Sequence, residues 1–200
     1  MTTVLAAAKR GRPIDDEKLE HVLVVATEEF AKRGYRAVTM REVARLADVS
    51  TRTLYNRFED KLSLFIACID TGAGAFPSLE LSHDGDIRDQ LVGFVSAVNS
   101  HLSMEPNLHM GMLVYRDGPD FPEIRRAAKQ NQETYLLRPL ARFLRAVGLE
   151  NSKDDKKAIV FLNMATSEWQ RRIVFGDPPL NSAEIAAHAE LVTDLFLNGA

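Results

Sequence analysis

Cysteine is almost missing from this chain of 200 residues, since Cys68 is the only one. An internal disulfide and a multi-cysteine zinc site are therefore excluded. No apolar run is long enough to cross a bilayer, and polar side chains interrupt the longest charge-free stretch, residues 90–104. The mildly apolar start lacks a basic n-region and runs straight into Lys9-Arg10-Gly11-Arg12, unlike a signal peptide. Together these absences predict a cytoplasmic protein with no membrane partner.

Arrangements typical of enzymes are lacking as well. The five histidines show no metal-ligand spacing, and Cys68 lies on the apolar side of a predicted helix. Gly72-Ala73-Gly74 begins like a nucleotide-binding loop, but it follows a helix and Pro77 stands where the last glycine belongs. We therefore predict no catalytic residue, no metal and no cofactor. A helical enzyme that binds a small molecule stays as a weaker alternative.

The charges that are present are distributed unevenly. The net charge is -3, yet residues 1–65 hold 12 basic and 10 acidic residues. Acidic side chains gather between residues 15 and 29, and basic ones dominate residues 33–61. One face of the N-terminal part should therefore be positive, as a polyanion requires. The charges alone leave an ordinary solvated face as the alternative.

Apolar residues recur at helical spacing almost everywhere, with no alternating strand pattern and no internal repeat. The spacing predicts a helix over residues 15–33 that ends at Gly34. A second, short helix follows from Thr39, which has capping-box spacing to Glu42. Ser50 can cap a third helix over residues 51–58, and Asp60 a fourth. The segment 72–85, rich in Gly, Pro, Ser and Asp, forms a joint between two domains.

The remainder of the chain predicts helices over residues 87–104, 108–115, 121–147, 153–175 and 183–197. Pro139 should kink or split the longest of these. The fold class is therefore all-α, with an N-terminal three-helix helix-turn-helix followed by a C-terminal helical domain.

The helix-turn-helix places a short third helix on the surface, where its outer face can enter a major groove. Val43, Ala44, Val49, Leu54 and Phe58 can pack against the first helix and fix the angle between the two short ones. The outer face would then carry hydroxyl, guanidinium and amide groups that read base edges or hold phosphates. These groups belong to Thr51, Arg52, Thr53 and Asn56.

Residues 30–65 closely resemble the DNA-binding signature of TetR-family regulators. The positions that carry the resemblance are Gly34-Tyr35, Thr39 to Ala44, Ala47 to Ser50, Thr53-Leu54-Tyr55, Phe58 and Lys61-Leu62. The resemblance implies about nine helices in three parts. Residues 1–14 would be a flexible basic arm, residues 15–59 the DNA-binding domain, and residues 60–200 a ligand-binding and dimerisation domain.

The resemblance also implies roles for single residues at the DNA. Thr39, Tyr55 and Lys61 would bond phosphates, and Thr51, Arg52 and Thr53 would face the bases. Ser50 and Asn56 complete the predicted DNA-binding residues of this segment. Each has a structural alternative, such as a helix cap for Thr39 or a free surface charge for Lys61. Asp48 stands where the family usually has glycine, and aspartate tolerates the positive φ that such a turn often needs.

The arm before the first helix gives a second DNA signal. Arg10-Gly11-Arg12-Pro13 resembles an AT-hook, in which an extended arginine segment lies in a narrow A·T-rich minor groove. Arg10 and Arg12 are therefore predicted to contact DNA. A solubilising basic tail is the alternative.

Two stripes of apolar residues on the last two helices suggest a homodimer, because a dimer can set two helix-turn-helix heads one turn of DNA apart. Pairing across a two-fold axis would give a four-helix interface. Intramolecular core is the alternative reading. The predicted interface residues are Ile159, Leu162, Trp169, Ile173, Ile185, Ala189, Val192 and Phe196.

A small-molecule pocket in the C-terminal domain is implied by the resemblance, with binding there moving the fourth helix and the DNA-binding heads. Thioethers and aromatics commonly line adaptable apolar cavities, although methionines at helical spacing are also ordinary core residues. The candidate ligand residues are His101, Met104, Met110, Met112, Tyr115, Asn131, Tyr135, Asn163 and Ser167. The sequence does not fix the ligand's chemistry.

We therefore expect a sequence-specific transcriptional regulator, a repressor that a small-molecule effector releases from a palindromic double-stranded DNA operator. An architectural protein that binds DNA without sequence preference is the alternative.

Overall fold

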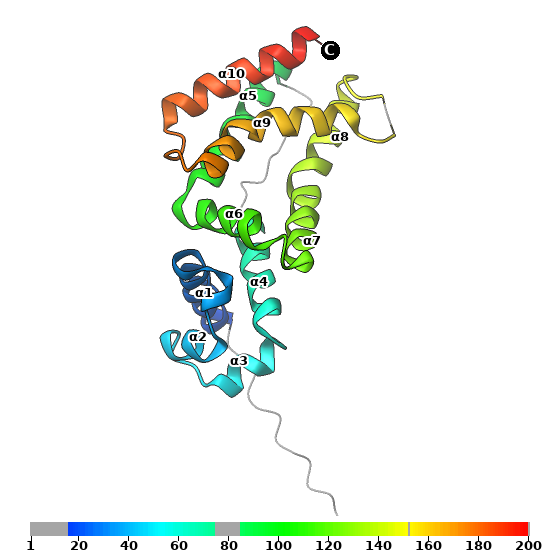
Figure 1. The fold of residues 1–200 in the computed structure, drawn as a ribbon. Helices are drawn as coiled ribbons and strands as arrows, with labels where there is room; N and C mark the ends of the chain where they lie inside the picture. The colour runs from blue at the N-terminus through cyan, green and yellow to red at the C-terminus, as the bar shows by residue number, and fades with distance from the viewer. Residues whose placement is uncertain (1–15, 75–84, 152, 200) are drawn as a thin grey trace, which may run out of the picture. The chain divides into compact units, whose positions relative to one another are not determined.

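The computed structural model describes residues 16–74, 85–151 and 153–199. Every regular element in these ranges is a helix (Figure 1). The helices form two compact units, one ending at Cys68 and the other starting at Ile69. None of the helices in the described ranges is long and apolar enough to cross a membrane. Arg10 and Arg12 lie outside the described residues.

The N-terminal unit contains three helices and the first part of a fourth. They are α1 (Asp16–Ala37), α2 (Met40–Leu46), α3 (Thr51–Arg57) and α4 (Lys61–Gly74). Gly34 has φ 82° and ψ 160°, so it breaks α1 close to the predicted end of this helix. A residue with a Cβ atom is disfavoured at this φ, which explains why glycine marks the position.

Side-chain caps fix where α2 and α3 begin. The predicted capping box is confirmed, because Thr39 Oγ1 accepts from the Glu42 amide while the Glu42 carboxylate accepts from the Thr39 amide. Ser50 Oγ accepts from the Thr53 amide at 3.0 Å and caps α3 as predicted. Each cap satisfies backbone donors that a helix leaves unpaired at its start.

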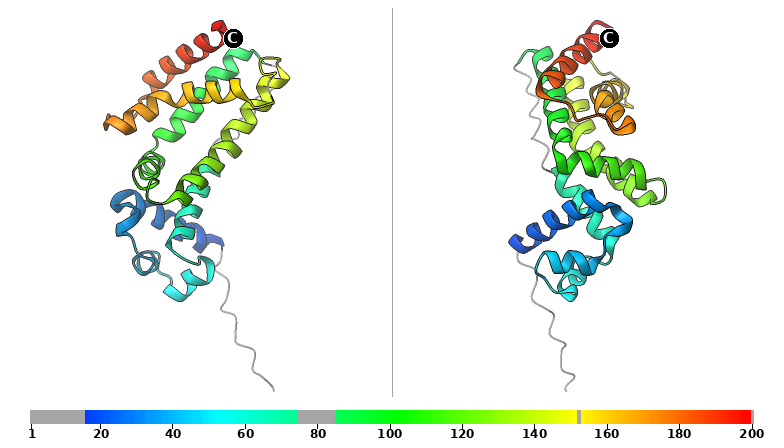
Figure 2. Two further views of the ribbon diagram at one scale, coloured as in Figure 1. Left: turned by 45° about the vertical axis from the view of Figure 1, so that its right-hand side comes forward. Right: turned by 60° about the vertical axis from the view of Figure 1, so that its left-hand side comes forward.

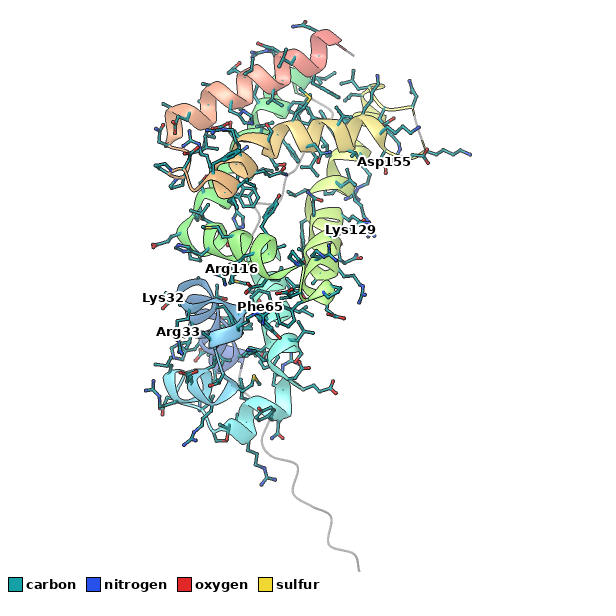
Figure 3. The ribbon with its side chains drawn as sticks, in the orientation of Figure 1. Lys32, Arg33, Phe65, Arg116, Lys129 and Asp155 are labelled. Carbon is teal, nitrogen blue, oxygen red and sulfur yellow. The ribbon has the colours of Figure 1, made fainter. Side chains whose placement is uncertain are left out.

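Three aromatic rings form the centre of the N-terminal core. Phe30 of α1 meets Phe65 of α4 edge-on, with ring centroids 4.9 Å apart, and Tyr35 lies 5.1 Å from Phe65. Figure 3 shows Phe65 reaching from α4 toward α1. Leu64 and Cys68 are buried as well. The first part of α4 thus belongs to the N-terminal core, which explains why the units divide inside α4 rather than before it.

The C-terminal unit is built from longer helices. They are α5 (Ile87–Ser103), α6 (Glu105–Asp117), α7 (Pro122–Asn131), the π-helical turn η1 (Gln132–Leu137), α8 (Arg138–Ala146), α9 (Lys156–Phe175) and α10 (Ser182–Gly199). Because α7, η1 and α8 run on without a break, they count as one helix, and the described residues then contain nine. The all-α prediction and the expected helix number are confirmed.

The predicted distortion at Pro139 takes the form of a π-helical turn. The Arg138 amide donates to the Glu133 carbonyl, five residues back, at the end of η1. Proline has no amide hydrogen and crowds the preceding turn of a helix. The wider π turn directly before Pro139 accommodates both effects without ending the helix.

The C-terminal core lies between α5, α8, α9 and α10, and Figure 2 shows α10 running along α5. Phe94, Phe143 and Phe161 are fully buried within it. Asn99 crosses this core, where its Nδ2 donates to the Val95 carbonyl at 2.9 Å and to the Ala165 carbonyl at 2.8 Å. A buried amide with these two bonds fixes α5 against α9.

Candidate nucleic-acid interface

The turn between α2 and α3 is tight and left-handed. Asp48 has φ 51°, so the prediction that this aspartate accepts a positive φ is confirmed. The Val49 amide donates to the Ala44 carbonyl at 2.9 Å, which closes the turn. Val43, Ala44 and Leu54 are buried beneath it. The two short helices are therefore fixed against their own core, and the opposite side of α3 faces solvent.

The exposed side of α3 carries four of the predicted DNA residues. Thr51, Arg52 and Asn56 are exposed, and the Tyr55 side chain is 54% exposed. Thr53 is half-buried and its hydroxyl lies 2.6 Å from Ser50 Oγ. Ser50 and Thr53 thus bond each other at the start of the helix, while the remaining four point outward.

Four arginines of α2 and α3 form no ion pair with any residue in the described ranges. Arg41, Arg45, Arg52 and Arg57 are all exposed. Arg33 of α1, by contrast, contacts Glu29 at 3.1 Å and Glu42 at 2.9 Å, and these bonds raise the pKa of its guanidinium. Figure 3 shows Arg33 and its neighbour Lys32 on α1. The basic surface available to an external anion therefore belongs to α2 and α3.

Thr39 and Lys61, predicted as phosphate contacts, bond to atoms of their own chain. Thr39 Oγ1 donates to the Glu42 carboxylate at 2.8 Å. Lys61 Nζ donates to the carbonyls of Tyr35 and Arg36, at 2.8 and 3.2 Å, and lies 4.5 Å from the centroid of the Tyr35 ring. A cation suits the carbonyl end of a helix, so Lys61 holds the end of α1. Lys61 and the end of α1 are about 25 residues apart in the sequence, and they come together only in the folded chain.

The predicted dimer residues are divided between the core and the surface. Six are buried within the chain's own core, namely Leu162, Trp169, Ile185, Ala189, Val192 and Phe196. Ile173 is half-buried, and Ile159 is 41% exposed. The six pack inward because they share a helix face with residues that meet α5 and with each other, as in the Phe161–Phe196 contact at 4.7 Å.

The outward apolar residues of α9 and α10 are therefore a different set from the predicted one. Besides Ile159, they are Val160, Val174, Phe175, Leu191 and Leu195, each more than half exposed. Their sequence spacing resembles that of the buried stripes, which is why the pattern alone did not separate the two faces.

The candidate ligand residues are also divided. His101 and Met110 are buried, and Asn131 is half-buried and donates to Asp70 Oδ1 at 3.0 Å. His101 Nε2 lies 3.0 Å from the Gly72 carbonyl, and burial lowers its pKa. The exposed candidates are Met104, Met112, Tyr115, Tyr135, Asn163 and Ser167. Among these candidates the structure therefore buries His101 and Met110, and it leaves two tyrosines, Met104 and Met112 accessible.

Trp169 anchors α6 rather than facing outward. Its Nε1 donates to the Leu102 carbonyl at 3.0 Å, and Tyr115 meets its ring at 6.4 Å. A Cβ atom on Gly111 would lie 2.6 Å from the Trp169 ring, so only glycine fits there. Sequence reasoning missed Gly111, because its requirement comes from a ring 58 positions away. Among the described residues, no cluster of three metal-ligating side chains occurs.

Comparisons with known proteins agree with this geometry. The family profile described as "Bacterial regulatory proteins, tetR family" matches residues 22–68. The transcriptional activator FasR of Mycolicibacterium smegmatis is 43% identical over 62 residues, which are 30% of this chain and 28% of FasR. The match thus spans less than a third of either protein.

Two solved structures match over nearly the whole chain. A TetR-family transcriptional regulator from Mesorhizobium loti has a TM-score of 0.80 at 20% identity, covering 92% of this chain and 96% of its own. The flavonoid-responsive regulator FrrA has a TM-score of 0.72 at 24% identity, covering 92% and 97%. The chain is thus similar to TetR-family regulators in its helix-turn-helix, which the family profile matches, and in the fold of nearly its whole length.

Proposed function

We propose that this regulator is a homodimeric repressor that binds a near-palindromic operator and leaves it when a small apolar molecule binds the C-terminal unit. The observation that carries the DNA part is the exposed α3 face, where Arg52 has no ion-pair partner among the described residues. A capped, outward-facing helix with an unpaired arginine suits major-groove recognition.

Within this proposal the residues of α3 divide into two roles. Thr51, Arg52 and Asn56 read base edges, since their exposed groups can donate and accept in the major groove. Tyr55 and the unpaired Arg57 bind phosphates and set the register of the helix on the duplex. Ser50 and Thr53 hold the start of α3 in place, because Ser50 Oγ accepts from the Thr53 amide. Thr39 and Lys61 then support the geometry of α1 and α2 more than they bind DNA.

Arg10 and Arg12 are proposed to insert into the minor groove beside each half-site. Deleting residues 1–12 should weaken binding mainly at A·T-flanked sites, because a narrow A·T-rich groove attracts inserted arginines. Equal affinity for A·T-flanked and G·C-flanked sites in both proteins would remove this role.

The homodimer is proposed on the exposed apolar face of α9 and α10. One helix-turn-helix makes few contacts, and a dimer reads two half-sites one helical turn apart. A monomer rarely exposes several large apolar residues on two adjacent helices without a partner. Val160, Leu191 and Leu195 belong to this face, and each is more than half exposed.

The ligand site is proposed around α6 and η1. Met112 is 40% exposed, Tyr115 46% and Tyr135 37%, although each is a large side chain that proteins usually cover. Tyr135 also lies on the π-helical turn, a feature that occurs often at functional sites. FrrA responds to flavonoids according to its name, and a flat aromatic molecule would suit tyrosine rings. The bond from Asn131 to Asp70 joins this region to the end of α4.

The first test is selection of bound sites from a random DNA library with the purified protein at near-physiological salt. A near-palindrome with two half-sites would support the proposed operator binding. An unenriched library, together with steep salt dependence, would instead indicate an architectural DNA-binding protein.

The second test compares two variants on the selected site. Arg52→Ala should cost about 1–3 kcal/mol of binding and relax specificity at one base pair. Lys32→Ala is the matched control, because Lys32 is an exposed cation of the same unit that pairs with Glu28. An equal loss on every DNA sequence would reassign Arg52 to a phosphate.

A further inference from the structure

A groove lies between the N-terminal half of α9 and the C-terminal half of α10. Its volume is about 270 Å³. Drug-sized ligands usually occupy about 300–1,000 Å³, whereas a cavity of about 150 Å³ can hold benzene. The groove therefore has room for one aromatic ring. It is lined by Lys156, Lys157, Val160, Met164, Leu195, Phe196 and Gly199.

Phe175 is an unusually exposed aromatic residue at the other end of α9. Its side chain is 72% exposed, the highest value among the large apolar residues that the structure describes. It is the last residue of the helix, and Gly176 with φ 73° ends α9 directly after it. A phenyl ring held in water at a rigid helix end is well placed for insertion into a partner, as in many interfaces where aromatics dominate the binding energy.

The groove and Phe175 lie on the same face of α9. With 3.6 residues per turn, Phe175 is three turns from Met164 and five turns from Lys157, so all three side chains point to one side. At 1.5 Å per residue, about 22 Å separate Val160 in the groove from Phe175. One helix face thus carries a hollow at its start and an aromatic at its end.

We propose that Phe175 of each copy fills the groove of its partner, in an antiparallel pairing of two α9 helices about a two-fold axis near their middle. The proposal rests on the homodimer proposed above and specifies how its two copies meet. In a two-fold interface each contact occurs twice. Each chain has one groove and one Phe175, so both grooves would be filled and both rings buried. Leu191, in the middle of α10, then faces its own counterpart.

The charges favour this antiparallel pairing over a parallel one. The first turn of α9 has no acidic residue and holds Lys156 and Lys157, which lie at the positive end of their own helix dipole. The end of the partner's α9, where Phe175 lies, is the negative end of a dipole, whereas Asp177 beyond it already pairs with Arg171 at 2.8 Å. A parallel pairing would bring four lysines together and leave both Phe175 rings outside a groove.

Engineered cysteines test the pairing directly. A chain carrying both Val160→Cys and Phe175→Cys should form covalent dimers on mild oxidation, because the two positions would come within disulfide reach across the interface. Either substitution alone should form almost none. Cys68 is a suitable silent background, since burial raises its thiol pKa to about 12. Efficient cross-linking of the Phe175→Cys single variant would overturn the pairing, because it would place the two helix ends together.

The dimer dissociation constant gives a second measurement, by analytical ultracentrifugation. Phe175→Ala should raise the constant about a hundredfold, because two buried aromatic contacts are lost at once. Val24→Ala is the matched control: this residue is 56% exposed but lies on α1 of the N-terminal unit, away from the proposed interface, and its truncation should change the constant less than about threefold.

The outcomes separate the two proposals. Both side chains are exposed in the single chain, so helical content should match the parent in each variant. A dimer whose constant does not respond to Phe175→Ala overturns this pairing and leaves the homodimer standing. A parent protein that sediments as a monomer at all concentrations overturns the homodimer, and this pairing with it.

Discussion

The two units differ in how far along the chain their stabilising side-chain bonds reach. In the N-terminal unit the caps join residues three apart, as in Thr39–Glu42, Ser50–Thr53 and Asp60–Ser63, and its longest described side-chain bonds span 26 positions from Lys61 and 45 from Cys68. In the C-terminal unit Arg88 bonds Asp194 across 106 positions, and Trp169 bonds the Leu102 carbonyl across 67. Short-range bonds leave a sequence signature, whereas long-range bonds depend on the finished fold.

This difference has a consequence for stability. A unit held by local caps and a small aromatic core should respond to single substitutions without involving the other unit, since each has a core of its own. The predictions below test this independence, beginning with the change that should cost most.

Phe30→Ala should destabilise the N-terminal unit by about 3–5 kcal/mol. Phe30 is fully buried and packs on both Tyr35 and Phe65, so its removal leaves a cavity at the centre of that core. Hydrogen exchange followed residue by residue should show faster exchange in α1 to α3, with α9 and α10 nearly unchanged. Operator binding should be lost in parallel.

Phe161→Ala is the matched variant in the C-terminal unit, where Phe161 is fully buried between Phe94 and Phe196. It should accelerate exchange in α5, α9 and α10 instead. If either variant accelerates exchange equally in both units, they form a single cooperative unit and the comparison fails.

Thr39→Ala should cost about 1 kcal/mol, within a range of about 0.5–2 kcal/mol, because it removes one half of the capping box of α2. Thr39→Ser keeps the hydroxyl and should retain most of the stability. Urea unfolding monitored by circular dichroism measures the stability of both variants.

Met104 provides the contrast, because it occupies the N-cap of α6 without a side-chain bond and is 56% exposed. Met104→Ala should change stability by less than about 0.5 kcal/mol, and an equal cost at both positions would argue against the cap as the cause.

The contrast between contacts that are short and long along the chain also explains which features the sequence could predict. Thr39, Ser50 and Gly34 act on neighbours within a few positions, and Asp48 was expected at positive φ from its place in the turn alone. Helices in the C-terminal unit were also predictable, since their periodicity is local. Even there the predicted helix 108–115 begins three residues after the observed start of α6, which Pro106 marks in the first turn.

The faces of α9 and α10 could not be predicted in the same way. Leu162 and Val160 are both apolar and differ only in direction, yet one is buried and the other is 53% exposed. Which side meets the core depends on α5, whose position no spacing within α9 encodes. For the same reason no local signal predicts that the Lys61 ammonium donates to the carbonyls of Tyr35 and Arg36.

Acid should weaken the hairpin of α9 and α10 through Glu168. Hydrogen bonds from Arg171 and Arg172 lower the pKa of this carboxyl group from 4.5 to about 2. Because the folded pKa lies below the unfolded value, the stabilisation is complete above pH 4.5 and disappears as the pH falls toward about 2. These ion pairs are partly exposed, so the contribution should not exceed about 1 kcal/mol.

Glu168→Gln should therefore be less stable than the parent at pH 7 and equally stable near pH 2, as measured by urea unfolding across that range. Glu190→Gln is a control on the same hairpin, because Glu190 contacts Arg88 of α5 instead of α9. A constant difference between Glu168→Gln and the parent at every pH would show that ionisation of Glu168 is not the cause.

The smallest expected effect compares two aspartates with almost the same backbone conformation, one in each unit. Asp48 has φ 51° and Asp155 has φ 53°, and glycine adopts this conformation without steric cost. Asp48 is exposed, and its side chain has no bond to another described residue, so Asp48→Gly should stabilise the N-terminal unit by about 0.5 kcal/mol.

Asp155 forms an ion pair with Arg145, and Figure 3 shows it at the start of α9. Asp155→Gly gains the same backbone relief but loses that pair, so its net effect on thermal unfolding should be near zero or unfavourable. If both substitutions stabilise equally, the Arg145–Asp155 pair contributes nothing to the stability of the C-terminal unit.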